Sequence, residues 1–294
     1  MEYRYVVIDV FTDAPYGGNP LAVFLNAPHL DVGQMQAIAR EMNLSETTFV
    51  TSSTAPGRFG VRIFTPATEL PFAGHPTVGT AVALAETGAA AGFSEIVLDQ
   101  VGGPVRVALK PGRATFTLGA PPERRESPAS VEAIAAALGV KPSQITAAPW
   151  QAGYADVAYL YVEMTDPAAV SAAWLTQDGF ERLGLWGPGV YVFASVGRTD
   201  GHEELFARSF VPGVGVPEDP ATGAAAAALA GTRIDAAHGG QCRLTINQGI
   251  DMGRPSRIET EATLVAGTVT SVSVGGRAVV VSEGRLLQLP RSLG

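Results

Sequence analysis

One short pattern occurs twice in the sequence, and this repeat is the most informative feature of the chain. The first copy reads R-I-F-T-P at residues 62–66 and H-P-T-V-G-T-A at residues 75–81. The second copy reads R-S-F-V-P at residues 208–212 and D-P-A-T-G-A-A at residues 219–225. Positions 75 and 219 are 144 residues apart, close to half of the 294-residue chain. A repeat at half the chain length predicts a duplicated protein with two domains.

Each copy ends in a run of small residues that predicts a helix, over residues 77–86 and 221–230. Proline is tolerated at the first helical position because its missing N–H has no intrahelical partner there. We therefore expect Pro76 and Pro220 at the first helical positions. Helices so rich in Ala and Gly have little side chain to bury. We expect a sheet to curl closely around each of them.

The residue before each proline is then expected at the N-cap, His75 in the first copy and Asp219 in the second. Helix N-termini carry unpaired N–H groups and a partial positive charge, so they favour small anions. A cationic imidazole is disfavoured there, and His75 is expected to be neutral. Aspartate is a preferred N-cap residue, so capping alone would explain Asp219, and a catalytic role is the open alternative.

Short runs of β-branched and aromatic residues recur along the chain, bounded by Gly, Pro or Asp. Helical patterns are fewer, and they are expected after Asp31, after Ser127 and after Asp166, the last carrying Val170 and Trp174. Because strands outnumber helices and do not alternate with them regularly, the sequence predicts an α+β fold with mostly antiparallel sheet.

The domain boundary is expected in the polar, proline-rich segment 120–128, which is the best linker candidate. The N-terminal half-repeat then covers residues 1–120 and the C-terminal half-repeat covers residues 121–294. The last strand, at about residues 278–290, is expected to pack back on the N-terminal domain.

Charge and composition exclude several classes of partner. Twenty Lys and Arg stand against 28 Asp and Glu, and this net charge of −8 argues against nucleic acids and anionic membrane surfaces. With 46% hydrophobic and 16% charged residues, the composition is typical of a folded chain. No signal-peptide pattern opens the sequence and no apolar run is long enough to span a membrane, so a cytoplasmic location is expected.

The single cysteine, Cys242, excludes an internal disulfide, a multi-cysteine zinc site and any mechanism that needs two thiols. Neither a P-loop nor a G-x-G-x-x-G dinucleotide motif occurs. No metal and no cofactor are therefore expected.

Motifs in both halves resemble those of the PhzF-like family, which is named for phenazine biosynthesis and has the diaminopimelate epimerase fold. The resemblance covers nearly the whole chain and rests on G-N-P-L-A-V at 18–23, N-L-S-E-T at 43–47, G-H-P-T at 74–77, E-D-P-A-T-G at 218–223 and M-G-R-P-S at 252–256. It implies two pseudo-symmetric domains, each a curled, barrel-like sheet around a central helix, with the active site in the cleft between the domains. It also implies a homodimer and a cofactor-independent isomerase.

Residue by residue, the resemblance matches the acid/base glutamate of the family to Glu46 and its paired histidine and aspartate to His75 and Asp219. The substrate-binding residues that it implies are Ser45, Gly74, Asn19, Gly223 and Ala224. The family often has serine at position 224, where it contacts the substrate carboxylate. Ala224 lacks that hydroxyl, which leaves anion binding to backbone N–H groups and Ser45 and puts the phenazine precursor in question as the substrate.

The implied reaction is proton transfer at carbon in a small, anionic, unsaturated carboxylic acid. Glu46 would remove a proton from a C–H group that neighbouring unsaturation makes acidic, and return it elsewhere on the conjugated system. Two alternatives remain open: an amino- or hydroxy-acid racemase or epimerase without thiol bases, and a non-catalytic protein that binds a small acid or a partner. Proton exchange in heavy water tests the second alternative, since a pure binder gives none.

Overall fold

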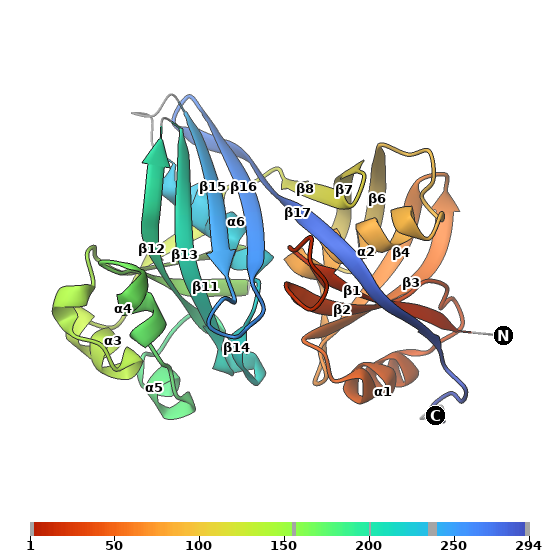
Figure 1. Cartoon of the computed structure of the whole chain (residues 1–294), viewed down its shortest axis with the longest axis horizontal. Helices are drawn as coiled ribbons and strands as arrows, with labels where there is room; N and C mark the ends of the chain where they lie inside the picture. Colours follow the sequence, from red (N-terminus) through yellow and green to blue (C-terminus); the bar gives the residue numbers. More distant parts are fainter. Residues whose placement is uncertain (1–2, 155–156, 200, 235–239, 292–294) are drawn as a thin grey trace. The chain divides into compact units, whose positions relative to one another are not determined.

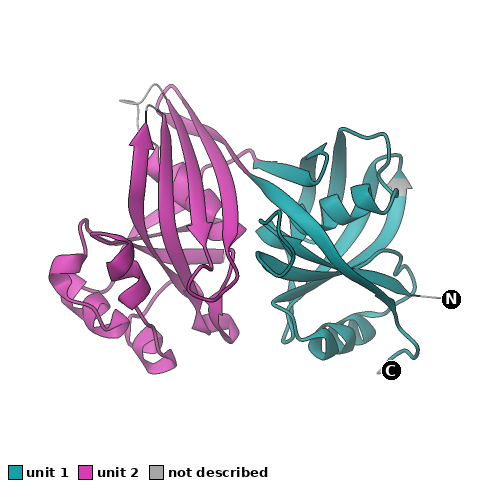
Figure 2. Cartoon of the chain, in the orientation of Figure 1, with its two compact units in different colours: residues 1–117, 275–294 teal, residues 118–274 magenta. Residues whose placement is uncertain are grey.

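The computed structural model describes residues 3–154, 157–199, 201–234 and 240–291, and the chain divides into two compact units (Figures 1 and 2). Unit 1 contains Met1–Thr117 and Gly275–Gly294, and unit 2 contains Leu118–Val274. No helix in the described part of the chain is both long enough and apolar enough to cross a membrane.

Unit 1 is built from the first ten elements, without the last residue of β8, and from the end of the last strand. They are β1 (Arg4–Val10), β2 (Asn19–Phe24), α1 (Val32–Met42), β3 (Glu46–Ala55), β4 (Arg58–Phe64), β5 (Glu69–Leu70), α2 (Gly74–Glu86), β6 (Glu95–Gln100), β7 (Gly103–Lys110), β8 (Arg113–Leu118) and the C-terminal part of β17 (Thr268–Arg285).

The sheet of unit 1 closes on itself as a barrel. Strand β1 pairs antiparallel with β2 on one side and with β17 on the other. Strand β2 is parallel to β3, and β4 is antiparallel to β3 and parallel to β6. The hairpins β6–β7 and β7–β8 follow, and β17 also pairs with β8. Because β17 reaches both β1 and β8, the ring of strands is complete.

Helix α2 is enclosed by this sheet, and every residue from Gly74 to Leu84 is buried. It packs against β1, β2, β3, β6 and β7. The approach is close because Gly79 has no side chain: a Cβ atom there would lie 2.6 Å from Leu21 Cδ2 and 2.6 Å from Val10 Cγ2. The small residues of the repeat therefore serve close helix–sheet packing, as expected.

Helix α1 covers the opposite face of this sheet and packs against β3 and β4. Its buried residues pack into an apolar cluster with Phe24, Phe49 and Phe64. The rings of Phe24 and Phe49 are stacked 4.9 Å apart, and Phe64 meets Phe49 edge-on at 5.6 Å. Strand β2 is almost wholly buried, because helices cover both of its faces.

Unit 2 repeats this plan with additional short helices. Its elements are β9 (Glu123–Glu126), α3 (Val131–Leu138), η1 (Pro142–Gln144), β10 (Trp150–Tyr154), β11 (Val157–Glu163), α4 (Pro167–Ala172), α5 (Gln177–Arg182), β12 (Gly189–Thr199), β13 (His202–Val211), η2 (Pro212–Val214), β14 (Val216–Asp219), α6 (Gly223–Arg233), β15 (Gln241–Gln248), β16 (Ser256–Val265) and the first part of β17. Helix α6 is the central helix of this unit and is almost entirely buried.

The order of strand pairings is the same in both units. Strands β10 and β11 are antiparallel like β1 and β2, and β11 and β12 are parallel like β2 and β3. Strand β13 is antiparallel to β12 and parallel to β15, as β4 is to β3 and β6. Strand β9 pairs with β10 as β17 pairs with β1. The prediction of two pseudo-symmetric, mostly antiparallel sheets, each around a central helix, is confirmed.

The repeated arginines have the same role in each unit. Arg62 makes a bidentate ion pair with Glu69, with N–O distances of 2.7 and 2.6 Å, and its guanidinium lies over the ring of Phe64. Arg208 pairs with Glu218 in the same way, at 2.8 Å for both contacts, and lies over Phe210. Each pair fixes the loop that leads into the central helix.

The expected starts of the central helices are wrong. Helix α2 begins at Gly74 with Ala73 as its N-cap, so His75 is the second helical residue and not the cap. Pro76 fits in this first turn because the first four N–H groups of a helix need no intrahelical partner. Helix α6 begins only at Gly223, with Thr222 as its N-cap, and Asp219 ends β14 instead of capping the helix.

Three other local predictions differ from the structure. Helix α3 starts at Val131 with Ser130 as its N-cap, while the hydroxyl of Ser127 accepts the Ala129 N–H in a separate turn. The expected linker contains strand β9. Helix α4 is capped by Asp166 as predicted but ends at Ala172, so Trp174 lies beyond it.

Candidate functional site

In unit 1 the candidate catalytic glutamate lies where a helix gives way to a strand. Helix α1 ends at Met42, and Asn43 adopts the left-handed conformation, with φ of 51°, that often ends a helix. Strand β3 then begins at Glu46, opposite Leu21 of β2. The pairing with β2 brings Glu46 near the start of that strand at Asn19.

The fold brings Glu46, His75 and Asn19 together. Glu46 Oε2 lies 3.4 Å from His75 Nδ1, and the two side chains are 17% and 5% exposed. Asn19 Nδ2 lies 3.3 Å from the same nitrogen. Asn19 follows Gly18, which has a φ of +61° and whose backbone packs so tightly against Val10 that a side chain would collide with the Val10 carbonyl oxygen. Glycine is needed there, since L-residues with a Cβ disfavour this φ.

Burial keeps the imidazole of His75 neutral. Desolvation lowers the pKa of His75 from 6.5 to about 3. The sequence predicted a neutral His75 because of the positive end of the helix. The lowered pKa agrees with a neutral ring, but its cause is burial away from water. Within the described ranges, Nε2 of His75 is buried and has no hydrogen-bond partner. A neutral ring with one nitrogen engaged and the other available can donate or accept one hydrogen bond from a ligand.

Two of the other expected residues adjoin this group along the chain. Gly74 is the first residue of α2, is buried, and directly precedes His75 in the chain. Ser45 directly precedes Glu46 and is half-buried. Both lie on the short segments that hold Glu46 and His75.

In unit 2, Asp219 lies at the end of β14 and belongs to a hydrogen-bond network. The hydroxyl of Thr222 donates to Asp219 Oδ2 at 2.6 Å. Gln248 Nε2 donates to the Asp219 carbonyl oxygen at 2.7 Å and to Thr222 Oγ1 at 3.0 Å. Thr222 belongs to the motif at residues 218–223, but no local pattern shows that Gln248, at the end of β15, meets it at the start of α6.

Gly223 and Ala224 form the first turn of α6. From Pro220 to Ala230 every residue is buried except Ala224, which is half-buried. The first turn of this helix is therefore accessible at the position where the family often has serine.

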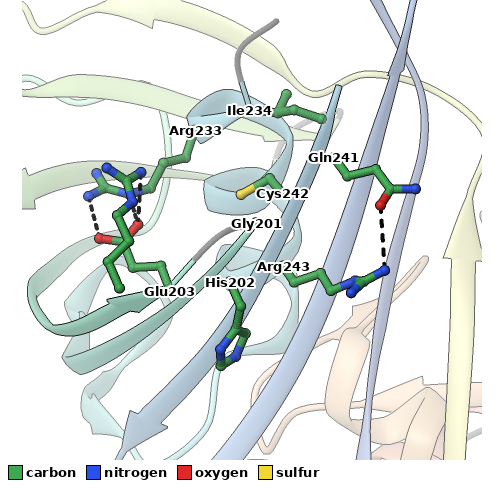
Figure 3. Close-up of a pocket in the computed structure, with 9 residues that line it drawn as sticks. Gly201, His202, Glu203, Arg233, Ile234, Gln241, Cys242 and Arg243 are labelled. Atoms are coloured by element: carbon green, nitrogen blue, oxygen red, sulfur yellow. Dashed lines mark hydrogen bonds and ion pairs between the residues drawn. The ribbon is translucent and has the colours of Figure 1, made fainter. Parts of the chain in front are cut away.

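A separate pocket in unit 2 contains none of the predicted site residues. It is lined by Arg198, Gly201, His202, Glu203, Arg233, Ile234, Gln241, Cys242 and Arg243 (Figure 3). Arg233 forms bidentate ion pairs with both Glu163 and Glu203, so the charges here are matched within the protein. In the described ranges no group of three or more His, Cys, Asp or Glu side chains is placed to hold a metal ion.

Comparison with known proteins gives concordant matches. The family model described as phenazine biosynthesis-like protein matches residues 8–284. An uncharacterized isomerase of Mesorhizobium japonicum is 43% identical, over 96% of this chain and 98% of the relative. The trans-2,3-dihydro-3-hydroxyanthranilate isomerase of Pseudomonas aeruginosa is 38% identical, over 96% and 99%.

Solved structures support the same fold. The Bacillus anthracis phenazine biosynthesis protein of the PhzF family superposes with a TM-score of 0.86, over 98% of this chain and 100% of that chain, at 22% identity. At this identity the likeness shows the fold alone, while the family model and the curated relatives cover nearly the full length. The chain therefore belongs to the phenazine biosynthesis-like (PhzF) family and is an isomerase.

Proposed function

We propose that this isomerase moves a proton between carbon atoms of a small unsaturated carboxylic acid, without a cofactor, and that Glu46 is its general acid and base. The observation that carries the proposal is the 3.4 Å contact between Glu46 Oε2 and Nδ1 of His75. It joins a carboxylate that keeps some solvent access to an imidazole whose pKa is lowered by burial, to about 3.

Glu46 performs both halves of the reaction in this proposal. Its carboxylate accepts a proton from a C–H group beside a conjugated system, and the electron pair of that bond enters the conjugated system. The protonated carboxyl group then returns the proton at another carbon, so atoms and electrons balance and the product is an isomer. Because 17% of the Glu46 side chain is exposed, the captured proton can exchange with solvent.

His75 orients the glutamate and contacts the substrate. A neutral imidazole carries one proton, so Nδ1 either donates to Glu46 or accepts from the Asn19 amide, and Nε2 takes the opposite role toward a ligand. Neutrality matters because an imidazolium ion would pair with the Glu46 carboxylate and lower its basicity.

Asp219 is proposed as the third polar residue of the reaction, holding an amine or hydroxyl group of the substrate. Its support is the motif at residues 218–223, which matches the family. Ser45, Gly74, Asn19, Gly223 and Ala224 are proposed as the substrate contacts. Backbone N–H groups at the starts of α2 and α6 would hold the substrate carboxylate and the negative charge that develops on deprotonation.

The named relatives support the proposed substrate class. Three curated relatives at 35–38% identity are trans-2,3-dihydro-3-hydroxyanthranilate isomerases. That compound is an unsaturated acid with an amine and a hydroxyl group, which suits the carboxylate, imidazole and helix termini described above. Since Ala224 offers no hydroxyl, we propose weaker binding of this acid than in a relative with serine there.

A thiol-based racemase has no support in this chain. The lone cysteine, Cys242, lies in β15, while His75 and Asp219 occupy the segments that begin the central helices. The proposed acid/base group is therefore the Glu46 carboxylate, oriented by the His75 imidazole.

The test is proton exchange in heavy water with trans-2,3-dihydro-3-hydroxyanthranilate as the probe. The wild type should form product that contains deuterium. In Glu46→Gln the rates of turnover and of deuterium exchange should both fall by at least about 100-fold, a typical contribution of general acid–base catalysis. Glu41→Gln, the same exchange at an exposed site of α1, is the control and should keep wild-type activity. Full activity in folded Glu46→Gln would overturn the assignment.

A further inference from the structure

Each unit has a buried glutamine at the same place in its fold. Gln100 is the last residue of β6 and Gln248 is the last residue of β15, the strands that follow the two central helices. Gln100 is 7% exposed and Gln248 is fully buried. A buried primary amide favours hydrogen-bond partners, and Nε2 of each glutamine donates to a threonine at the start of the central helix. Among the described residues the oxygen of Gln248 has partners as well, while Gln100 Oε1 has none.

In unit 2 the glutamine lies in a directional hydrogen-bond chain. The Tyr191 hydroxyl donates to Gln248 Oε1 at 2.9 Å, and the Thr222 N–H donates to the same oxygen at 3.3 Å. Gln248 Nε2 then donates to Thr222 Oγ1 at 3.0 Å, and that hydroxyl donates to Asp219 Oδ2 at 2.6 Å.

In unit 1 the corresponding chain is shorter. Gln100 Nε2 donates to Thr77 Oγ1 at 2.8 Å, and that hydroxyl donates to the Ala73 carbonyl oxygen at 2.7 Å. Ala73 is the N-cap of α2, so this chain ties the first turn, which contains His75, to the end of β6.

We propose that Gln248 and Thr222 are positioning residues that fix the carboxylate of Asp219. Gln100 and Thr77 stand at the matching place in unit 1, where Thr77 donates to the backbone of Ala73. The inference rests on the proposed function, in which Asp219 and His75 contact the substrate. It adds that a glutamine–threonine pair at the start of α6 sets the orientation of Asp219.

The physical reason is that a hydroxyl has only one proton. Since Thr222 Oγ1 accepts the hydrogen bond of Gln248, its own proton is directed to Asp219. Gln248 is itself held in one orientation because its oxygen accepts from Tyr191 and its nitrogen donates to the Asp219 carbonyl. Burial and the nearby Asp219 charge raise the pKa of Tyr191, so its phenol stays protonated and remains a donor.

The first arm of the test measures kinetics of the full chain with trans-2,3-dihydro-3-hydroxyanthranilate as the substrate. Thr222→Val removes the hydroxyl and keeps the side-chain shape, and should lower kcat by about tenfold or more, with a KM change below about threefold, since hydrogen bonds to charged groups are the strong ones. Thr222→Ser restores the hydroxyl and should recover activity to within about threefold of the wild type. Thr232→Val, the same exchange near the other end of α6, is the matched control and should leave kcat unchanged.

A double mutant distinguishes positioning from a general structural effect. If Thr222 acts through Asp219, Thr222→Val/Asp219→Asn should be no slower than Asp219→Asn alone. Additive losses, or an active Asp219→Asn single mutant, would overturn the inference.

The second arm is crystallographic and needs no substrate. In Thr222→Val the Asp219 carboxylate should rotate away from its wild-type orientation or occupy several, and in Thr222→Ser it should keep that orientation. An unchanged carboxylate in Thr222→Val would overturn the inference even if the wild type is active. A wild type that does not turn over or exchange the acid would count against the proposed function, while this arm still decides the positioning role.

Discussion

At the scale of single residues, His75 is a titratable group that the fold keeps uncharged. Its pKa is lowered by burial to about 3, from 6.5 in an exposed setting. Between these two pH values the unfolded chain binds a proton that the folded chain does not. His75 therefore makes the free energy of unfolding rise with pH up to about 6.5, and this stability is lost as the pH falls below that value.

We expect His75→Asn to flatten this dependence. Between pH 4.5 and 6 the free energy of unfolding of the wild type should fall more steeply with decreasing pH than that of the variant, by at most about 1.4 kcal/mol per pH unit. Urea denaturation at several pH values measures both slopes. Replacement of the exposed His29 by Asn is the control and should keep the wild-type slope. Equal slopes for the wild type and His75→Asn would contradict the expectation.

At the scale of elements, the two central helices need small residues because the sheets enclose them. Gly79 shows the constraint, since its missing Cβ would meet Leu21 and the stiff, β-branched Val10. The repeat of small residues predicted this enclosure. It did not predict the first residues of the helices, because His75, Pro76 and Asp219 are compatible with several positions near a helix start, and contacts with neighbouring strands decide among them.

Gly79→Ala should destabilise the protein although alanine is the better helix former. The helix-propensity gain is at most about 1 kcal/mol, while overpacking a core costs about 1–3 kcal/mol, so a net loss of about 1 kcal/mol is expected. Chemical denaturation measures the difference. Gly119→Ala, at a glycine with open space around its Cβ position, is the control and should be close to neutral. A stabilised Gly79→Ala variant would show that the sheet yields to the extra methyl group.

At the scale of the whole molecule, strand β17 belongs to both units. Its residues up to Val274 lie in unit 2, and those from Gly275 onward lie in unit 1, where they pair with β1. The last eleven residues of this strand, Gly275 to Arg285, complete the barrel of unit 1. The ring of unit 1 thus depends on a segment far away in the sequence.

Removal of residues 275–294 should therefore unfold unit 1. The loss of β17 from β1 and β8 opens the barrel and exposes two strand edges, which favours aggregation. Circular dichroism and size-exclusion chromatography would detect the loss of fold. A chain ending at Leu287 keeps β17 and loses only contacts such as the Gln34 hydrogen bond to Pro290, so it should remain folded. A stable, monodisperse chain ending at Val274 would contradict the role of β17.

The sequence by itself determined the duplication, the α+β class, the enclosed helices and the residue types available for chemistry. Periodicity, repeats and motifs are local, so they are readable without a fold. Only the tertiary structure decided that Glu46 and Asn19 meet His75, that Gln248 reaches Thr222 and Asp219, and that β17 closes unit 1. These contacts join residues from 26 (Thr222 and Gln248) to 281 (Arg4 and Arg285) positions apart. Their geometry depends on strand register and packing, which no local pattern contains.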